Sequence, residues 1–191
     1  MWAVVGLGNP GIDYSKTRHN IGFTFIKRVA KEWNVRLKKR IYLSKAAVVE
    51  KDNENILLAM PQTYMNNSGL AVKKIMEGIG INSEHLLVAF DDLDIPLGEV
   101  RIRKEGGGGT HKGVNSIIRE INTTRFPRIR LGIGLLEPGK DAAEYVLSPF
   151  QKDEKPLVEE VVIRAQKALS FILKDEIEKA MNFYNQKIKT V

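Results

Sequence analysis

Short apolar runs alternate along the chain with longer amphipathic segments. Runs bounded by glycine or polar residues predict buried strands at Trp2–Gly6, Leu86–Phe90 and Ile129–Ile133. Two further runs, Leu43–Glu50 and Ile56–Met60, are separated by turn-forming polar residues and predict a hairpin. The sequence therefore predicts a sheet in which at least one pair of strands is antiparallel.

The segments between and after these runs carry apolar residues at helical spacing. They predict helices over His19–Trp33, over Asn67–Glu77, from a glycine run at 106–109 to Ile121, and over Pro156–Leu173. Asp175 followed by Glu178 is a capping signal, and it predicts a last helix that runs through Tyr184 and Ile188. Val100–Arg103 alternates apolar and charged residues and predicts a strand with one polar face.

Interleaved strands and helices define the fold class as α/β, with a mixed sheet flanked by helices. A length of 191 residues favours one domain over residues 1–191, closed by C-terminal helices at about 156–188. No apolar run approaches the ~20 residues needed to cross a bilayer, and no basic segment precedes the first strand. We therefore expect a cytoplasmic protein without membrane contact.

The chain carries a net charge of +7 and no cysteine, which excludes disulfides, thiolate metal sites and a cysteine nucleophile. Residues 101–130 contain eight basic and two acidic residues, a net of +6. A locally basic, solvated surface is one interpretation of this segment. Its position beside the glycine run favours the other interpretation, which is phosphate binding.

Ligand sites in open α/β sheets gather beyond the carboxyl ends of the strands. Four loops qualify if their strands are neighbours and parallel: residues 8–11, 65–69, the acidic cluster 91–94 and the glycine run 106–109. Residues 6–11 read G-x-G-x-x-G, which is typical of dinucleotide sites, but a polar, aperiodic segment follows where a helix should begin. Residues 106–113 lack the Gly-Lys-Ser/Thr ending of a phosphate loop.

Three histidines are present, and no two have metal-ligand spacing on one helix, so we expect no metal site. His19 falls where a helix begins, and the helix dipole there favours a neutral imidazole that can accept a proton. Asp91 is placed to orient it, although the acidic cluster is equally compatible with a solvated turn or a magnesium site. With no G-x-S-x-G motif and no thiol, a base-activated water is the expected nucleophile.

Five ordered blocks resemble the signatures of bacterial-type peptidyl-tRNA hydrolases, and the resemblance runs from Met1 to about Pro149. The blocks are residues 6–22 (GLGNPG, Tyr14 and TRHNIG), 61–69 (PQTYMNNSG), 91–98 (DDLDIP and Gly98), 109–117 (GTHKGVNSI) and 128–134 (RIRLGIG). The resemblance implies a single-domain monomer that uses no metal or cofactor. It implies that the substrate is peptidyl-tRNA and that the ester between peptide and tRNA is hydrolysed.

The resemblance also implies a role for each matching residue. His19 would be the general base, and Asp91 would orient it. The substrate-binding set would be Asn9, Tyr14, Tyr64, Asn66 and Lys112, and the tRNA-binding set Arg101, Arg103 and Arg130. The fourth block departs from the family pattern Gly-Gly-His-Asn-Gly, because Thr110 and Lys112 replace a glycine and the asparagine. An ammonium group only donates, whereas an amide also accepts, so position 112 cannot act here as the asparagine does.

Two other hypotheses remain open from the sequence. One is a non-catalytic RNA-binding protein on the same fold, which a turnover assay would separate from an enzyme. The other is a nucleotide-dependent oxidoreductase that uses residues 6–11, which binding of a reduced dinucleotide would reveal.

Overall fold

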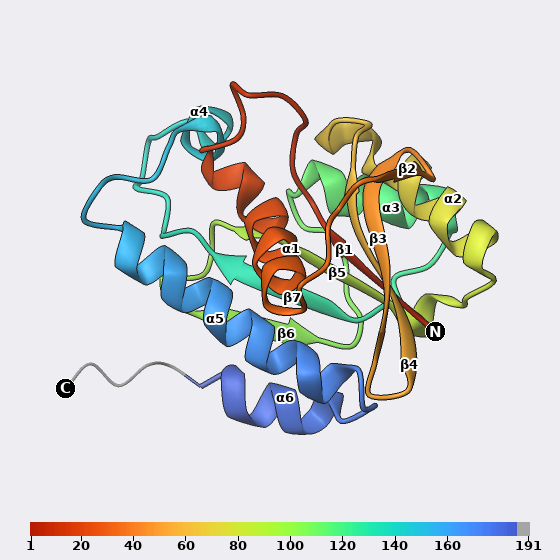
Figure 1. Ribbon diagram of the computed structural model, residues 1–191. Coiled ribbons are helices and arrows are strands. Elements are labelled where there is room, and N and C mark those ends of the chain that lie inside the picture. Colours follow the sequence, from red (N-terminus) through yellow and green to blue (C-terminus); the bar gives the residue numbers. More distant parts are fainter. Residues whose placement is uncertain (187–191) are drawn as a thin grey trace.

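The computed structural model describes residues 1–186, and its centre is a mixed seven-stranded sheet in the order β2-β3-β4-β1-β5-β7-β6 (Figure 1). The strands are β1 Trp2–Gly6, β2 Lys39–Ile41, β3 Ser44–Lys51, β4 Glu54–Pro61, β5 Leu86–Asp92, β6 Val100–Arg103 and β7 Arg128–Gly132. The four central strands β4, β1, β5 and β7 are parallel, whereas β2, β3 and β6 join through antiparallel pairs. The carboxyl ends of the four central strands therefore meet at one rim.

Helices cover both faces of this sheet, with α5 and α6 in front of it in Figure 1 and α2 and α3 behind it. The α-helices are α1 Ile21–Glu32, α2 Ser68–Ile79, α3 Lys112–Ile121, α4 Ala142–Leu147, α5 Lys155–Ile172 and α6 Ile177–Tyr184. Three 3-10 turns are η1 Arg18–Asn20, η2 Met65–Asn67 and η3 Ser83–His85. Alternate residues of each central strand enter two separate cores. Val4 of β1 packs with α1 and α5, and Val5 packs with α2 and α3.

Helix α1 begins directly against the rim because glycine lies at the contact. A Cβ atom on Gly22 would come within 2.5 Å of the Leu7 carbonyl oxygen and 2.6 Å of the Ala89 carbonyl oxygen. Only glycine permits so close an approach of a helix to strand backbone. The turn η1, which carries His19 and immediately precedes α1, is thereby held above the ends of β1 and β5.

The predicted α/β class and the mixed sheet are confirmed. The predicted capping of the last helix at Asp175 is wrong, because α6 begins after Glu176 and Asp175 has a φ of +58°. The predicted extension of this helix to Ile188 lies outside the described residues.

Strand β6 is antiparallel to β7, so the glycine run leaves the sheet at the end opposite the rim. Over residues 1–186, no helix is both long and apolar enough to cross a membrane.

Candidate active site

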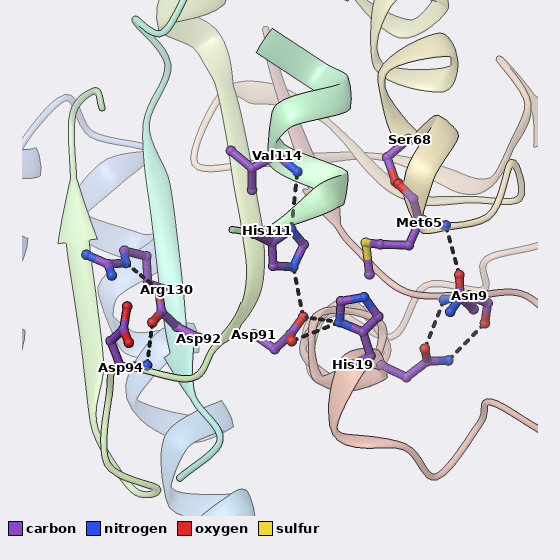
Figure 2. A network of polar contacts seen from close by, with 11 residues as sticks. Asn9, His19, Met65, Ser68, Asp91, Asp92, Asp94, His111, Val114 and Arg130 are labelled. Carbon is purple, nitrogen blue, oxygen red and sulfur yellow. Dashed lines mark hydrogen bonds and ion pairs between the residues drawn. The ribbon is translucent and has the colours of Figure 1, made fainter. Parts of the chain in front are cut away.

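His19 and Asp91, which are 72 residues apart in the sequence, are in direct contact at the rim. The His19 Nδ1 atom lies 2.8 Å from both carboxylate oxygens of Asp91 (Figure 2). Asp91 ends up here because β5 continues two residues beyond the predicted run and includes the aspartate. The Asp91 side chain is only 2% exposed, so water competes little for this contact.

A second imidazole, that of His111, binds the same carboxylate. Its Nε2 atom lies 3.0 Å from Asp91 Oδ1, and its Nδ1 atom accepts the backbone N–H of Val114 at 3.2 Å (Figure 2). Because Nδ1 is an acceptor, the ring proton is on Nε2 and points at Asp91. Sequence reasoning left His111 out of the site, although it lies within the fourth matching block.

The two histidines determine the charge of Asp91. Burial raises the pKa of this carboxyl, but the electrostatic and hydrogen-bonding contributions of His111 and then His19 outweigh it and hold the pKa well below its ordinary value. Asp91 is therefore ionised at neutral pH and accepts an N–H from each ring. When His19 donates from Nδ1, its Nε2 keeps a lone pair that can take a proton.

Asn9 presents an amide whose orientation is fixed. Its Oδ1 accepts the backbone N–H of Met65 at 2.8 Å, so its NH₂ group is left to face the groove (Figure 2). Its backbone is held by reciprocal bonds to the side chain of Asn20, each of 2.9 Å. Asn20 directly follows His19, so one turn of chain supports both the imidazole and the amide.

The backbone of Tyr64 is strained. Its φ of +58° and ψ of 160° lie in a region that is almost confined to glycine, and such residues cluster at functional sites. The conformation turns the Met65 N–H toward Asn9 and leaves the Tyr64 ring exposed beside Tyr14, with ring centroids 6.3 Å apart. Asn66, the next residue in η2, is exposed at the same place.

These side chains line one groove with a volume of about 970 Å³. One end of the groove is formed by Tyr14, Tyr64 and Asn66. The groove is also lined by His19 and Asp91. The other end is formed by the glycine run, Arg103 and Arg130, with α4 along one wall. Lys112, the first residue of α3, is exposed and lines the groove beside His111.

The glycine run crosses back from the far end of β6 to reach this groove. The buried guanidinium of Arg128 supports it by donating to the carbonyls of Gly107 (3.2 Å) and Thr124 (2.8 Å). Burial and then the charge of Arg130 lower the pKa of Arg128 to about 10, so it stays positive at neutral pH. Arg128 was not among the predicted site residues.

The three predicted tRNA-binding arginines share the face of the sheet opposite α5. Arg101 and Arg130 are cross-strand partners, and Arg103 lies two residues further along β6. Two of the three guanidinium groups are paired within the chain. Arg101 donates to Glu99 at 2.7 Å and Arg130 to Asp92 at 2.5 Å. Arg101 does not line the groove.

Over residues 1–186, one cluster has metal-ligand residue types in reach, namely His19, Asp91 and His111, with donor atoms within 4.8 Å of one another. The Val114 N–H fixes a proton on the His111 nitrogen that faces Asp91. That nitrogen donates its hydrogen to the carboxylate and has no lone pair with which to bind a metal ion. The arrangement suits a carboxylate that accepts two N–H groups better than a set of metal ligands. Asp92, the next residue of the acidic cluster, accepts hydrogen bonds from the Arg130 guanidinium and from the backbone N–H of Asp94.

A carboxylate-bound imidazole beside a free amide donor, at the rim of an α/β sheet, is an arrangement of the kind that hydrolases use to activate water. The family model for peptidyl-tRNA hydrolase matches residues 3–191. The chain is 44% identical to the peptidyl-tRNA hydrolase of Persephonella marina, over 97% of this chain and 98% of that one. It is 39% identical to the Bacillus subtilis protein of that name, over 98% and 100% of the two chains.

Solved structures agree with the sequence relatives. The peptidyl-tRNA hydrolase of Acinetobacter baumannii superposes with a TM-score of 0.89 at 31% identity, over 95% of this chain and 93% of that one. A peptidyl-tRNA hydrolase crystallised with N-propanol superposes with a TM-score of 0.91 at 31% identity, over 99% and 97%. The chain belongs to the peptidyl-tRNA hydrolase family, and it hydrolyses the ester bond that joins a peptide to tRNA.

Proposed function

We propose that His19 is the general base of this hydrolysis and that Asp91 orients it. The contact between His19 Nδ1 and the Asp91 carboxylate is the observation that carries the proposal. The free Nε2 atom of His19 takes a proton from water, and the hydroxide attacks the carbonyl carbon of the ester. The ionised Asp91 stabilises the imidazolium that forms, and the proton leaves with the ribose oxygen.

The amide of Asn9 is the proposed donor to the oxyanion that develops on the carbonyl oxygen. Its Oδ1 is already occupied by Met65, so the NH₂ group is directed at the substrate. Asn66, Tyr14 and Tyr64 form the end of the groove that receives the peptide. A free α-ammonium would have to lose its hydration there without a partner, so N-blocked substrates are favoured over aminoacyl-tRNA.

Lys112 replaces the asparagine of the family pattern, and we assign it to a carbonyl or phosphate oxygen of the substrate, since it can only donate. Arg103 and Arg130, with Arg101 behind them, hold tRNA phosphates at the opposite end of the groove. The protein works as a single-domain cytoplasmic monomer, without a metal or a cofactor.

Replacement of His19 by asparagine tests the base directly. With N-acetyl-aminoacyl-tRNA at saturation, His19→Asn lowers kcat about 10³-fold while KM changes little, because the ring acts on water in the chemical step. Lys27→Gln, an exposed change on α1, is the control and keeps wild-type constants. A His19→Asn protein with wild-type kcat would remove the proposed base.

A further inference from the structure

One strongly basic surface takes no part in the groove described above. Residues 33–49 contain five basic residues and no acidic residue. The five are Arg36, Lys38, Lys39, Arg40 and Lys45, all exposed, and they lie just before β2, on β2 and at the start of β3. We call this set the β2 basic edge, since β2 is the outermost strand on its side of the sheet.

The charges of the β2 basic edge are not neutralised within the described residues. None of its five members takes part in an ion pair there. The opposite edge differs, because Arg101 is paired with Glu99, Lys104 with Glu178 and Arg130 with Asp92. Over residues 1–186, the β2 basic edge therefore presents cations that a polyanion can reach without displacing a carboxylate.

Two of these cations are held side by side against their own repulsion. Arg40 and Lys45 are direct cross-strand partners in the antiparallel pair of β2 and β3. Like charges directly opposite one another on adjacent strands destabilise a sheet by about 0.2–1 kcal/mol. Further along the same strand, Lys51 faces Glu54, which is the usual favourable arrangement. The Arg40–Lys45 pair weakens the fold, and binding of a phosphate between the two cations reverses the sign of that interaction.

The β2 basic edge lies at the same rim as the groove. Ile41 of β2 pairs with Ser44 of β3, which pairs with Pro61 at the carboxyl end of β4. Tyr64, which lines the groove, follows three residues later. Two strand spacings, about 10 Å, separate β2 from β4, so the edge flanks the Tyr64 end of the groove, and a tRNA that is also held by Arg103 and Arg130 must span the groove to reach it.

The edge is also held rigidly to the element that carries Asn66. Tyr42 and Leu43 both have positive φ in the two-residue turn between β2 and β3. The Tyr42 hydroxyl donates to the Gly78 carbonyl of α2 at 3.2 Å. The ring packs so closely that a Cβ atom on Gly78 would lie 2.1 Å from it. Helix α2 begins just after Asn66, so the basic edge and the groove are parts of one rigid unit.

We propose that the β2 basic edge is a second RNA-binding surface, which holds the sugar–phosphate backbone of the substrate's tRNA away from its 3′ end. The proposal rests on peptidyl-tRNA as the substrate, and it does not depend on the role of His19. The groove holds the ester and the terminal nucleotides, while the edge adds phosphate contacts that carry no sequence information. Such contacts lower KM and make it depend on salt.

The test compares two substrates and matched lysine variants. One substrate is full-length N-acetyl-aminoacyl-tRNA, and the other is the N-acetyl-aminoacyl ester of a CCA trinucleotide. Lys45→Gln and Arg40→Gln remove one charge each from the edge. Lys51→Gln is the control, since it lies on the same strand and the same face as Lys45, about 20 Å away.

With full-length substrate, each edge variant raises KM and flattens the plot of log(kcat/KM) against log salt by about one unit of slope. The loss of kcat/KM between 50 and 200 mM salt thereby shrinks about threefold for each lost contact. The trinucleotide ester is cleaved by the edge variants with wild-type constants. Lys51→Gln matches wild type with both substrates.

Edge variants with wild-type KM and salt slope on full-length substrate would overturn the proposal. The proposal is also overturned if the edge variants form oligomers in sedimentation experiments while their KM stays unchanged. The charges would then serve only to keep the exposed strand β2 from pairing with another molecule. Lys45→Gln removes a repulsion, so urea denaturation should show no loss of stability and unfolding cannot explain a raised KM. The rate of hydrolysis of the trinucleotide ester depends on the groove alone. It therefore shows a failure of the catalytic proposal independently of any result for the β2 basic edge.

Discussion

At the residue scale, the site depends on which atom of each polar side chain already makes a hydrogen bond within the protein. Asn9 uses its oxygen to hold the Met65 N–H and leaves its nitrogen to face the groove. His111 uses Nδ1 to hold the start of α3 and offers Nε2 to Asp91. Because these partners are backbone groups, the orientation of each side chain survives changes in neighbouring side chains. Two predictions follow from these fixed orientations.

Asn9→Asp separates the two functions of the Asn9 amide. The carboxylate keeps an acceptor for the Met65 N–H, so the fold is retained, but it removes the donor and brings negative charge toward the oxyanion. We expect kcat to fall by a factor that corresponds to about 3 kcal/mol or more. Saturation kinetics would measure this, with circular dichroism as the check on folding. Wild-type kcat in this variant would exclude Asn9 as the oxyanion donor.

His111→Ala tests whether the second imidazole adjusts the first. The Asp91 carboxyl loses the larger of the two contributions that lower its pKa, so its pKa rises. The acid limb of the kcat/KM profile therefore moves to higher pH, because Asp91 becomes protonated sooner as the pH falls. His85→Ala, which changes a half-buried histidine that does not line the groove, leaves the profile in place. A profile for His111→Ala that coincides with wild type would show that His111 only supports α3.

At the element scale, the approach of α1 to the rim sets the position of His19. Gly22→Ala places a methyl group against the carbonyls of Leu7 and Ala89, and helix and strand must separate. We expect a loss of about 1–3 kcal/mol in unfolding free energy and a lower kcat, since η1 moves with α1. Gly107→Ala meets no atom within 4 Å, so it serves as the control and changes stability little. Urea titrations of both variants would give the comparison.

The long, strongly periodic elements could be predicted from the sequence, and the short ones could not. Strand β2 has three residues, and α4 has six, so neither shows a period that could be recognised. The direction of β6 was missed because antiparallel pairing to β7 depends on partners that the local pattern of residues 100–103 does not contain. The confirmed fold class depended on the apolar runs that became β1, β4, β5 and β7.

For the site, the position of His19 at a helix start and of Asp91 at a strand end sufficed to predict their contact. His111 was missed because its role comes from a tautomer, which the backbone of Val114 fixes in three dimensions. Arg128 was missed because its carbonyl partners, at residues 107 and 124, come together only through the folded loop. A motif identifies residues that gather, and hydrogen-bond partners then determine what each residue does.

At the scale of the whole molecule, Arg18 joins the site to the C-terminal helices. Its guanidinium donates to Glu154 at the start of α5, at 2.7 and 2.9 Å, and to the Ile133 carbonyl just beyond β7 at 2.9 Å. Burial raises the pKa of the Glu154 carboxyl, but the hydrogen bonds from Arg18 and from the Gln151 N–H, together with the charge of Arg18, outweigh it and lower the pKa. The folded-state pKa is depressed, so this stabilisation is present at neutral pH and is lost as the pH falls through that value.

Arg18→Met should therefore cost about 3 kcal/mol of unfolding free energy at neutral pH, because Glu154 is left without its partner. Arg28→Met is the control, since Arg28 of α1 pairs with Glu159 of α5 and the two side chains are 35% and 64% exposed. Its loss should stay below about 1 kcal/mol. Urea denaturation at neutral and acidic pH would show the gap between the variants closing as Glu154 becomes protonated. A constant gap would mean that Arg18 acts instead through its guanidinium contacts with the rings of Tyr145 and Phe150, at 4.5 and 4.8 Å from the ring centroids.

The reciprocal bonds between Asn9 and Asn20 have one more consequence. The proposed base, His19, and the proposed oxyanion donor, Asn9, depend on consecutive residues of a single short turn, so a thermal fluctuation displaces them as a pair. A partly loosened enzyme would then have either a complete site or none. On heating, the number of competent molecules would fall while the turnover of each one stayed constant. Active-site titration during gradual inactivation would show this as an unchanged rate per remaining site.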